Sequence, residues 1–165
     1  MIERIRLTSI SAKELGIFWI WQNSYVLKTP DGTLVAIDPH LVKNPNSEYV
    51  GEPPMRPEEM HVDYVFCTHD HWDHADPQTL QVIGKHSPKT LFLGTPECYQ
   101  RFLSVGIPPE RARSLDPGVS ITLKGFKVVS LYSILPEVTK ALKQTTHYSY
   151  VFDLGFVRLY DFGDS

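Results

Sequence analysis

Five of the six residues from position 69 to 74 carry side chains that can bind a metal ion: His69, Asp70, His71, Asp73 and His74. The row directly follows a largely apolar run at 62–67. Because alternate side chains of an extended segment point the same way, His69 and His71 can converge on one cation. A turn after His71 would bring Asp73 and His74 toward a second cation. The spacing therefore predicts a site for two metal ions.

The types of ligand in this row indicate an open metal site. Imidazole nitrogens and carboxylate oxygens suit zinc, and also manganese or iron, and no thiolate stands in the same register to close a structural zinc site. Open coordination positions imply a bound, activated water. The alternative is a histidine-rich surface tract with adventitious metal affinity. That reading is disfavoured because a strand leads into the row, the ligands keep an ordered register, and a further acid follows later in the chain.

Three segments of the chain carry a resemblance to a known superfamily. The segment 68–74 resembles the Thr-His-x-His-x-Asp-His signature of the metallo-β-lactamase superfamily. The stretch 35–39 looks like that superfamily's strand ending in an aspartate, and 159–165 looks like its later strand ending in Gly-Asp-Ser or Gly-Asp-Thr. Order and separation both fit, and the resemblance spans nearly the whole chain.

A narrower resemblance concerns one branch of this superfamily. The segments 68–71, 106–111 and 160–165 together are similar to the L-ascorbate-6-phosphate lactonases, a branch of bacterial cytoplasmic hydrolases. Tyr160-Asp161 departs from the aromatic-histidine pair often found there. That departure weakens the transfer of the exact substrate and leaves the metal site intact.

The resemblance implies an α/β fold, the metallo-β-lactamase-like αββα sandwich, here with a mixed sheet and helices on one face. Members of the superfamily pair two similar halves. We therefore expect residues 1–165 to form a single partial domain, the N-terminal half, with the C-terminal half absent. Asp164 would then ligate metal from a fraying terminus, which is a poor place for a preorganised group.

The same resemblance implies a role for each residue of the site. His69 and His71 should hold the first metal. Asp73 and His74 should hold the second, with Asp73 also able to orient the water as a catalytic residue. Asp164 is placed to bridge both ions. His147 is the one candidate for the superfamily's further histidine, and the sequence leaves it evenly balanced between ligand and surface residue.

Other polar residues are assigned supporting roles. Asp38 could accept a hydrogen bond from a ligating imidazole and fix its orientation, the alternative being a turn cap before Pro39. Asp70 should point away from its histidine neighbours. Trp72 should pack the loop or form a pocket wall. The remaining histidines are expected at the surface, with His40 the best exception: His40, His61 and His86.

Composition narrows the class of protein. With 165 residues, 42% hydrophobic and 21% charged, the chain reads as globular. A net charge of −3 and a pI near 6.1 give no general attraction for nucleic acid or anionic membranes. Cys67 and Cys98 form no disulfide framework and are expected to be reduced packing residues. No signal core and no apolar run of about 20 residues is apparent, so we expect a cytoplasmic protein.

Periodicity predicts alternating strands and helices. Strands are expected at 16–27 and 33–37, forming one hairpin, and at 62–68, 90–94, 119–123, 126–132, 148–153 and 157–160. Helices are expected at 76–83 and 96–105. The stretch 40–60 contains four prolines and should be a long loop or lid beside the metal site.

These features favour hydrolysis by a metal-activated water. The lactonase resemblance implies a sugar-phosphate lactone as substrate, although the same centre would serve a phosphodiester, for which Lys43, Arg56 and Arg101 are candidate phosphate contacts. The cofactors would be two zinc or manganese ions. A non-catalytic fragment or assembly module, completed by self-association or by a complementing C-terminal half, stays open. A di-iron redox role is a lesser alternative.

Overall fold

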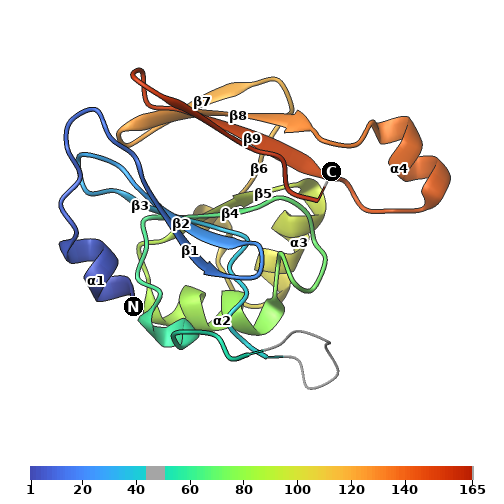
Figure 1. Ribbon diagram of the computed structural model, residues 1–165. Coiled ribbons are helices and arrows are strands. Elements are labelled where there is room, and N and C mark those ends of the chain that lie inside the picture. The colour runs from blue at the N-terminus through green and yellow to red at the C-terminus, as the bar shows by residue number, and fades with distance from the viewer. Residues whose placement is uncertain (44–50, 165) are drawn as a thin grey trace.

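A computed structural model describes residues 1–43 and 51–164 of the protein. Two β-sheets pack face to face, and helices lie on the outer side of the larger sheet (Figure 1). The predicted α/β sandwich with a mixed sheet is therefore confirmed.

The larger sheet has six strands in the order β1-β2-β3-β4-β5-β6. They are Gly16–Trp21, Ser24–Lys28, Leu34–Ile37, Tyr64–Cys67, Leu91–Gly94 and Ala112–Ser114. The first three pair antiparallel, and β3 to β6 pair parallel. The prediction of a single strand over 16–27 was wrong, because the chain turns at Gln22, whose φ of 51° lies in the left-handed region.

The smaller sheet has four antiparallel strands in the order β10-β9-β8-β7. They are Arg158–Asp161, Tyr148–Asp153, Phe126–Tyr132 and Ser120–Leu123. The two predicted hairpins are confirmed, with Gly125 and Gly155 at their turns in the left-handed conformation. This sheet extends to the C-terminal end of the described chain, which lies close to the end of β4 (Figure 1).

The helices are α1 (Ile2–Leu7), α2 (Pro77–His86), α3 (Pro96–Ser104) and α4 (Pro136–Leu142), and single 3-10 turns lie at Pro57–Glu59 and Pro109–Arg111. Helix α2 begins where the Asp76 carboxylate accepts from the backbone N–H groups of Gln78 and Thr79. Helix α3 begins where Thr95 accepts from the N–H of Cys98. The sequence analysis missed α1, α4 and β6, which are all short.

Two apolar cores result from this layering. One lies between the larger sheet and the helices and includes Val65, Leu80 and Phe102. The other lies between the sheets and includes Phe66 and Tyr150. Strand β4 serves both cores, so its four residues are all buried, as its continuous apolar run predicted. Cys67 and Cys98 are free, buried packing residues, also as predicted.

The segment 106–111, which carried part of the lactonase resemblance, has a structural task. The Arg111 guanidinium donates to the carbonyl oxygens of Gly84 and Ser87 at 2.8 and 3.0 Å. It thereby caps the C-terminal end of α2. Ile107 packs so closely on Gly84 that a Cβ there would lie 2.9 Å from it. The motif fixes α2 against the sheet and lies apart from the histidine row.

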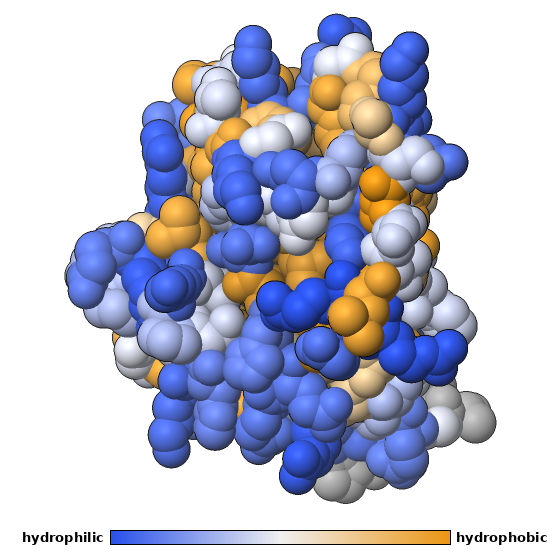
Figure 2. Space-filling model, turned by 90° about the vertical axis from the view of Figure 1, so that its left-hand side faces the viewer, coloured by the Kyte–Doolittle hydropathy of each residue, from blue (hydrophilic) through white to orange (hydrophobic). Residues whose placement is uncertain are grey.

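The predicted long loop at 40–60 falls partly outside the described residues, since 44–50 are among those not described. Figure 2 views the face that bears α1, where hydrophilic residues predominate and apolar groups form small patches. Across the described ranges, no helix combines the length and apolarity needed to span a bilayer.

Candidate metal centre

The candidate site lies where neighbouring parallel strands end. Asp38 directly follows β3, and Thr68 with the histidine row directly follows β4. The backbone N–H of Tyr148 donates to the carbonyl of Thr68 at 2.8 Å, which ties the start of β9 to this edge. Carboxyl ends of parallel strands are the usual place for ligands in open α/β sheets. The arrangement brings His147 and the histidine row together from opposite sheets.

One group of possible ligands consists of His69, His71 and His147, whose ligand atoms all lie within 4.8 Å of one another. His69 Nε2 lies 2.9 Å from His71 Nδ1. The His147 ring stacks on His69 with 4.0 Å between the ring centroids. His147 is buried, so the structure places it beside the predicted ligands and away from the surface.

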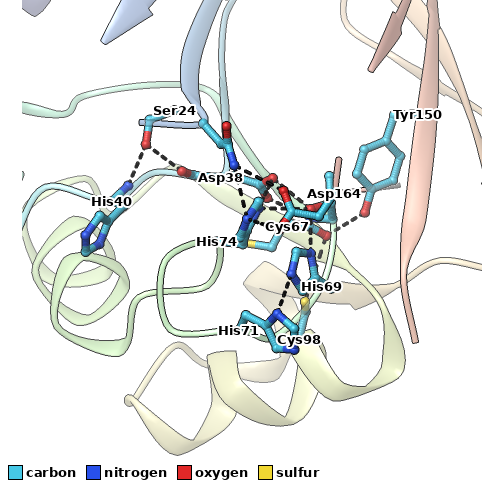
Figure 3. Close-up of polar contacts among 12 residues, drawn as sticks. Ser24, Asp38, His40, Cys67, His69, His71, His74, Cys98, Tyr150 and Asp164 are labelled. Carbon is cyan, nitrogen blue, oxygen red and sulfur yellow. Dashed lines mark hydrogen bonds and ion pairs between the residues drawn. The ribbon is translucent and has the colours of Figure 1, made fainter. Parts of the chain in front are cut away.

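A second group consists of His69, His74 and Asp164, again within 4.8 Å. His74 Nε2 lies 3.3 Å from Asp164 Oδ2. His69 belongs to both groups and therefore lies between them, with Asp38, His74 and Asp164 on one side and His71 on the other (Figure 3).

Two predicted roles differ from this grouping. Asp73 belongs to neither group of described residues, although its charge helps to raise the pKa of His74. Asp164 belongs to one group only, whereas a bridging ligand would face both. The roles of Asp73 as ligand and of Asp164 as bridge stay predictions.

Asp38 orients His74 directly and His69 through Thr68. Its Oδ1 accepts from the Thr68 N–H, and its Oδ2 accepts from the Thr68 hydroxyl, both at 2.7 Å. The same Oδ2 lies 2.7 Å from His74 Nδ1. The predicted contact between Asp38 and a histidine of the row is present, and the alternative of a turn cap is not needed. The left-handed φ of 45° at Asp38 is strain of the kind that collects at functional sites.

These contacts determine which ring nitrogens face the site. His74 donates Nδ1–H to Asp38, so in the neutral ring, the form that binds metal, the lone pair is on Nε2. The Thr68 hydroxyl proton goes to Asp38, so Oγ1 accepts from His69 Nδ1–H at 3.0 Å. Nε2 is consequently the nitrogen that both His69 and His74 have free to bind a metal ion.

Electrostatics favours neutral imidazoles at two of the positions. Burial, reinforced by the nearby histidines, lowers the pKa of His69 to about 2. Burial also lowers the pKa of His147. For His74, burial opposes protonation, but the hydrogen bond and charge of Asp38 raise its pKa to about 9. Neutral imidazole is the form that binds metal.

His147 provides the test of whether a metal fits. Both of its ring nitrogens are buried, and neither has a hydrogen-bond partner among the described residues. Buried polar atoms are rarely left without a partner, because desolvation then goes uncompensated. The imidazole nitrogens and the carboxylate oxygen gathered here suit a divalent transition metal. The residues present therefore fit the predicted ions.

Comparison with known proteins decides the family. A family model described as "Beta-lactamase superfamily domain" matches residues 16–165. The chain belongs to the beta-lactamase superfamily. A UPF0173 metal-dependent hydrolase of Koribacter versatilis is 32% identical over 77 residues, which are 47% of the chain and 30% of that relative. Another, of Archaeoglobus fulgidus, is 39% identical over 61 residues, 36% of the chain and 22% of the relative. The chain thus spans less than a third of either relative.

Solved structures show the same fold. CmlA, a diiron beta-hydroxylase of Streptomyces venezuelae, superposes with a TM-score of 0.68 at 19% identity, covering 94% of the chain and 30% of CmlA. A possible metal-dependent hydrolase of Veillonella parvula gives a TM-score of 0.66 at 16% identity, covering 87% of the chain and 60% of that protein. At these identities the likeness concerns the superfamily's fold and not its chemistry.

His40, the best exception among the histidines expected at the surface, is buried and only 1% exposed. Its ring stacks on Trp21 and meets Trp72 edge-on, each at 5.3 Å, and Nδ1 lies 3.4 Å from the Asp76 carboxylate. Trp72 and His40 line a cavity of about 460 Å³, so Trp72 does form a pocket wall. His61 and His86 are exposed, as expected.

Two residues near the centre escaped the sequence analysis. Asn23, in the turn between β1 and β2, has its amide nitrogen 3.1 Å from Asp164 Oδ1. Asp161 has a buried carboxyl oxygen without a partner, and burial together with the charge of Asp38 raises its pKa to about 7. Asn23 carries no sequence signal, and Asp161 stood out only as a departure from the lactonase motif, because strand pairing is what brings both to the site. Asp70 instead lies 3.5 Å from Arg101 and belongs to neither ligand group of the described residues.

Proposed function

We propose that the protein is a metal-dependent hydrolase that uses a water activated by two divalent ions, zinc or manganese. The observation that carries this proposal is the pair of ligand groups that share His69, completed by the buried, partnerless nitrogens of His147. When bound, the ions would supply a nucleophilic water near neutral pH and stabilise charge on the attacked group. The names of the partial relatives support the same chemistry.

The protein's own residues would prepare this centre. His69, His71 and His147 would hold one ion, and His74 and Asp164 the other. Asp38 and Thr68 lock the rings of His74 and His69 so that Nε2 of each faces inward. We propose that Asp73 orients the attacking water, since it stands in the loop between His71 and His74.

For the substrate, we propose a lactone such as a sugar-phosphate lactone, opened at its carbonyl. The resemblance to the lactonase branch supports it. A phosphodiester has less support, because each candidate phosphate contact already pairs with an acid. Lys43 lies 2.7 Å from Glu52, Arg56 lies 3.4 Å from Glu59, and Arg101 lies 3.5 Å from Asp70.

We further propose that the protein works in the cytoplasm and that residues 1–165 act together with more protein, either a second copy or a complementing C-terminal half. Exposed apolar side chains support a partner. Leu135 and Leu142 at α4 are 65% and 61% exposed, and Phe162 beyond β10 is 54% exposed. Such side chains usually find cover in an assembly. Size measurement in solution tests this, and a monomer at micromolar concentration would contradict self-association.

Elemental analysis of the purified protein, followed by lactone and phosphodiester hydrolysis assays, tests the proposed activity. We expect two bound ions, hydrolysis of the lactone, and loss of activity in His71→Ala. His61→Ala is the matched control, because His61 is exposed and outside both ligand groups. Substoichiometric metal without hydrolysis, at a confirmed intact mass, would favour the non-catalytic assembly module.

A further inference from the structure

We propose that Asn23 is a positioning residue that holds Asp164 in the orientation needed to bind metal; this inference rests on the proposed function. The Asn23 amide nitrogen lies 3.1 Å from Asp164 Oδ1 and 3.4 Å from His74 Nε2. The other carboxylate oxygen, Oδ2, lies 3.3 Å from His74 Nε2. The amide thus engages one oxygen of Asp164 and leaves the other beside His74.

The turn that carries Asn23 is held on its N-terminal side. Gln22 has a φ of 51°, and the pairing register shifts between Trp19 and Trp21. A left-handed non-glycine residue is strained and persists only where its surroundings fix it. The Trp19 indole N–H supplies such a restraint by donating to the Gln22 carbonyl at 2.7 Å.

The turn is held on its C-terminal side by the strand that carries Asp38. The Ser24 hydroxyl donates to the Asp38 carbonyl at 2.7 Å and accepts from the His40 N–H at 2.9 Å. Figure 3 shows Ser24 joined to both Asp38 and His40. Asn23 is therefore fixed relative to the same residue, Asp38, that orients His74.

The chemistry of an amide suits this task. Its nitrogen can only donate, and it carries no charge, so it fixes a carboxylate without competing with a cation for it. Asp164 lies beyond β10, outside the hydrogen-bonded sheet, and is 44% exposed at its side chain. A ligand that is this exposed needs a restraint from a neighbouring side chain to be preorganised. Partners of ligating side chains typically contribute 10–100-fold to metal affinity.

The test is titration of the metal-free protein with Co²⁺, followed by visible absorption and calorimetry, for wild type, Asn23→Ala and Asn23→Asp. Gln100→Ala, which removes an exposed amide from α3, is the control. We expect one of two sites to weaken by about 10–100-fold in Asn23→Ala, with the other site unchanged. Asn23→Asp should weaken the same site at least as much, because a carboxylate repels Asp164. Denaturant unfolding of the metal-free variants should match wild type.

The outcomes separate the inference from the proposed function. If wild type binds two ions and both Asn23 variants bind them equally well, the positioning role is overturned while the hydrolase proposal stands. If wild type binds no Co²⁺, the proposed function is overturned and this inference with it. If Asn23→Ala unfolds more easily than wild type, its lower affinity cannot be assigned to positioning, and the isosteric Asn23→Asp is then the test variant. Wild-type Co²⁺ affinity in Asn23→Asp would overturn the positioning role.

Discussion

The His74 imidazole and the Asp38 carboxylate lie 2.7 Å apart, and both side chains are almost fully buried. Asp38 ends one strand and His74 closes the histidine row that follows the neighbouring strand, so the contact joins two parallel strands at their carboxyl edge. Thr68 completes the unit by donating twice to the same carboxylate. The orientation of the candidate metal centre therefore depends on a carboxylate that belongs to neither ligand group of the described residues.

This pair predicts a pH dependence of the metal-free protein. The pKa of His74 is about 9 when folded and near 6.5 when unfolded. A raised pKa means that the stabilisation is fully present below pH 6.5 and is lost as the pH rises through 9. The loss should be on the order of 3 kcal/mol. Urea unfolding in the presence of a chelator at pH 6, 8 and 9.5 measures it.

Asp38→Asn is the matching variant for this pH dependence. It keeps the shape of the side chain and removes the charge that raises the pKa of His74. The alkaline decline should flatten in this variant, and its stability at pH 6 should fall toward the value that wild type has at pH 9.5. A variant that declines as steeply as wild type would show that another group titrates there.

His147→Ala should remove one of the two ions. Its ring stacks on His69, and its nitrogens are buried without partners, so a bound ion is the contact that would satisfy them. We expect affinity for that ion to fall by more than the roughly 100-fold typical of outer partners. Metal-free stability should change little, since an unsatisfied buried group is removed. Metal content after dialysis is the readout, with His61→Ala as control; equal content in both variants would exclude His147 as a ligand.

The fold was predictable where the signal was local and strong. The apolar run before the histidine row predicted β4, and glycines between alternating segments predicted both hairpins of the smaller sheet. Helix α1 has only six residues, which is too short for a helical pattern of apolar residues to be recognised. The turn at Gln22 was missed because it uses a left-handed glutamine where a glycine or asparagine is the usual signal.

The candidate site was predictable to the extent that its members are neighbours in sequence. The row from 69 to 74 carries its own spacing, and Asp38 was identified from a strand-end position. His147 could not be separated from a surface histidine, because its burial results from β9 pairing at Thr68. The burial of His40 could be suspected only from its place after Asp38-Pro39, because the burial itself results from packing against Trp21 and Trp72. Tertiary packing determines whether such residues are buried, and a single sequence does not predict that packing.

Lys28 provides a prediction about stability alone. It is 7% exposed, and its ammonium donates to the carbonyl oxygens of Ile5, Arg6 and Thr8 at the end of α1. Lys28→Met would keep the volume and leave these carbonyls without their charged donor, at a cost of about 3 kcal/mol. Lys89→Met, at an exposed position, should change stability by less than about 0.5 kcal/mol. Thermal and denaturant unfolding would compare them, and equal stabilities would show that water replaces the ammonium.

Two glycines allow backbone strain to be separated from contact with the candidate centre. Gly155 has a φ of 84° and nothing within 4 Å of an added Cβ, whereas Gly163 has a φ of 59° and would place a Cβ 3.1 Å from the Thr68 side chain. Gly155→Ala should therefore cost only the left-handed penalty, roughly 1–2 kcal/mol.

Gly163→Ala should carry the same left-handed backbone penalty as Gly155→Ala and should also displace neighbouring groups. The new methyl group would push Thr68, which holds Asp38 and His69, or move the neighbouring Asp164. We expect affinity for metal to fall by about 10-fold or more in this variant and to stay at the wild-type value in Gly155→Ala. Metal titration beside unfolding of the metal-free proteins separates the two effects. Equal losses of stability with unchanged metal affinity in both would mean that the close approach of the Gly-Asp turn to Thr68 does not matter for the centre.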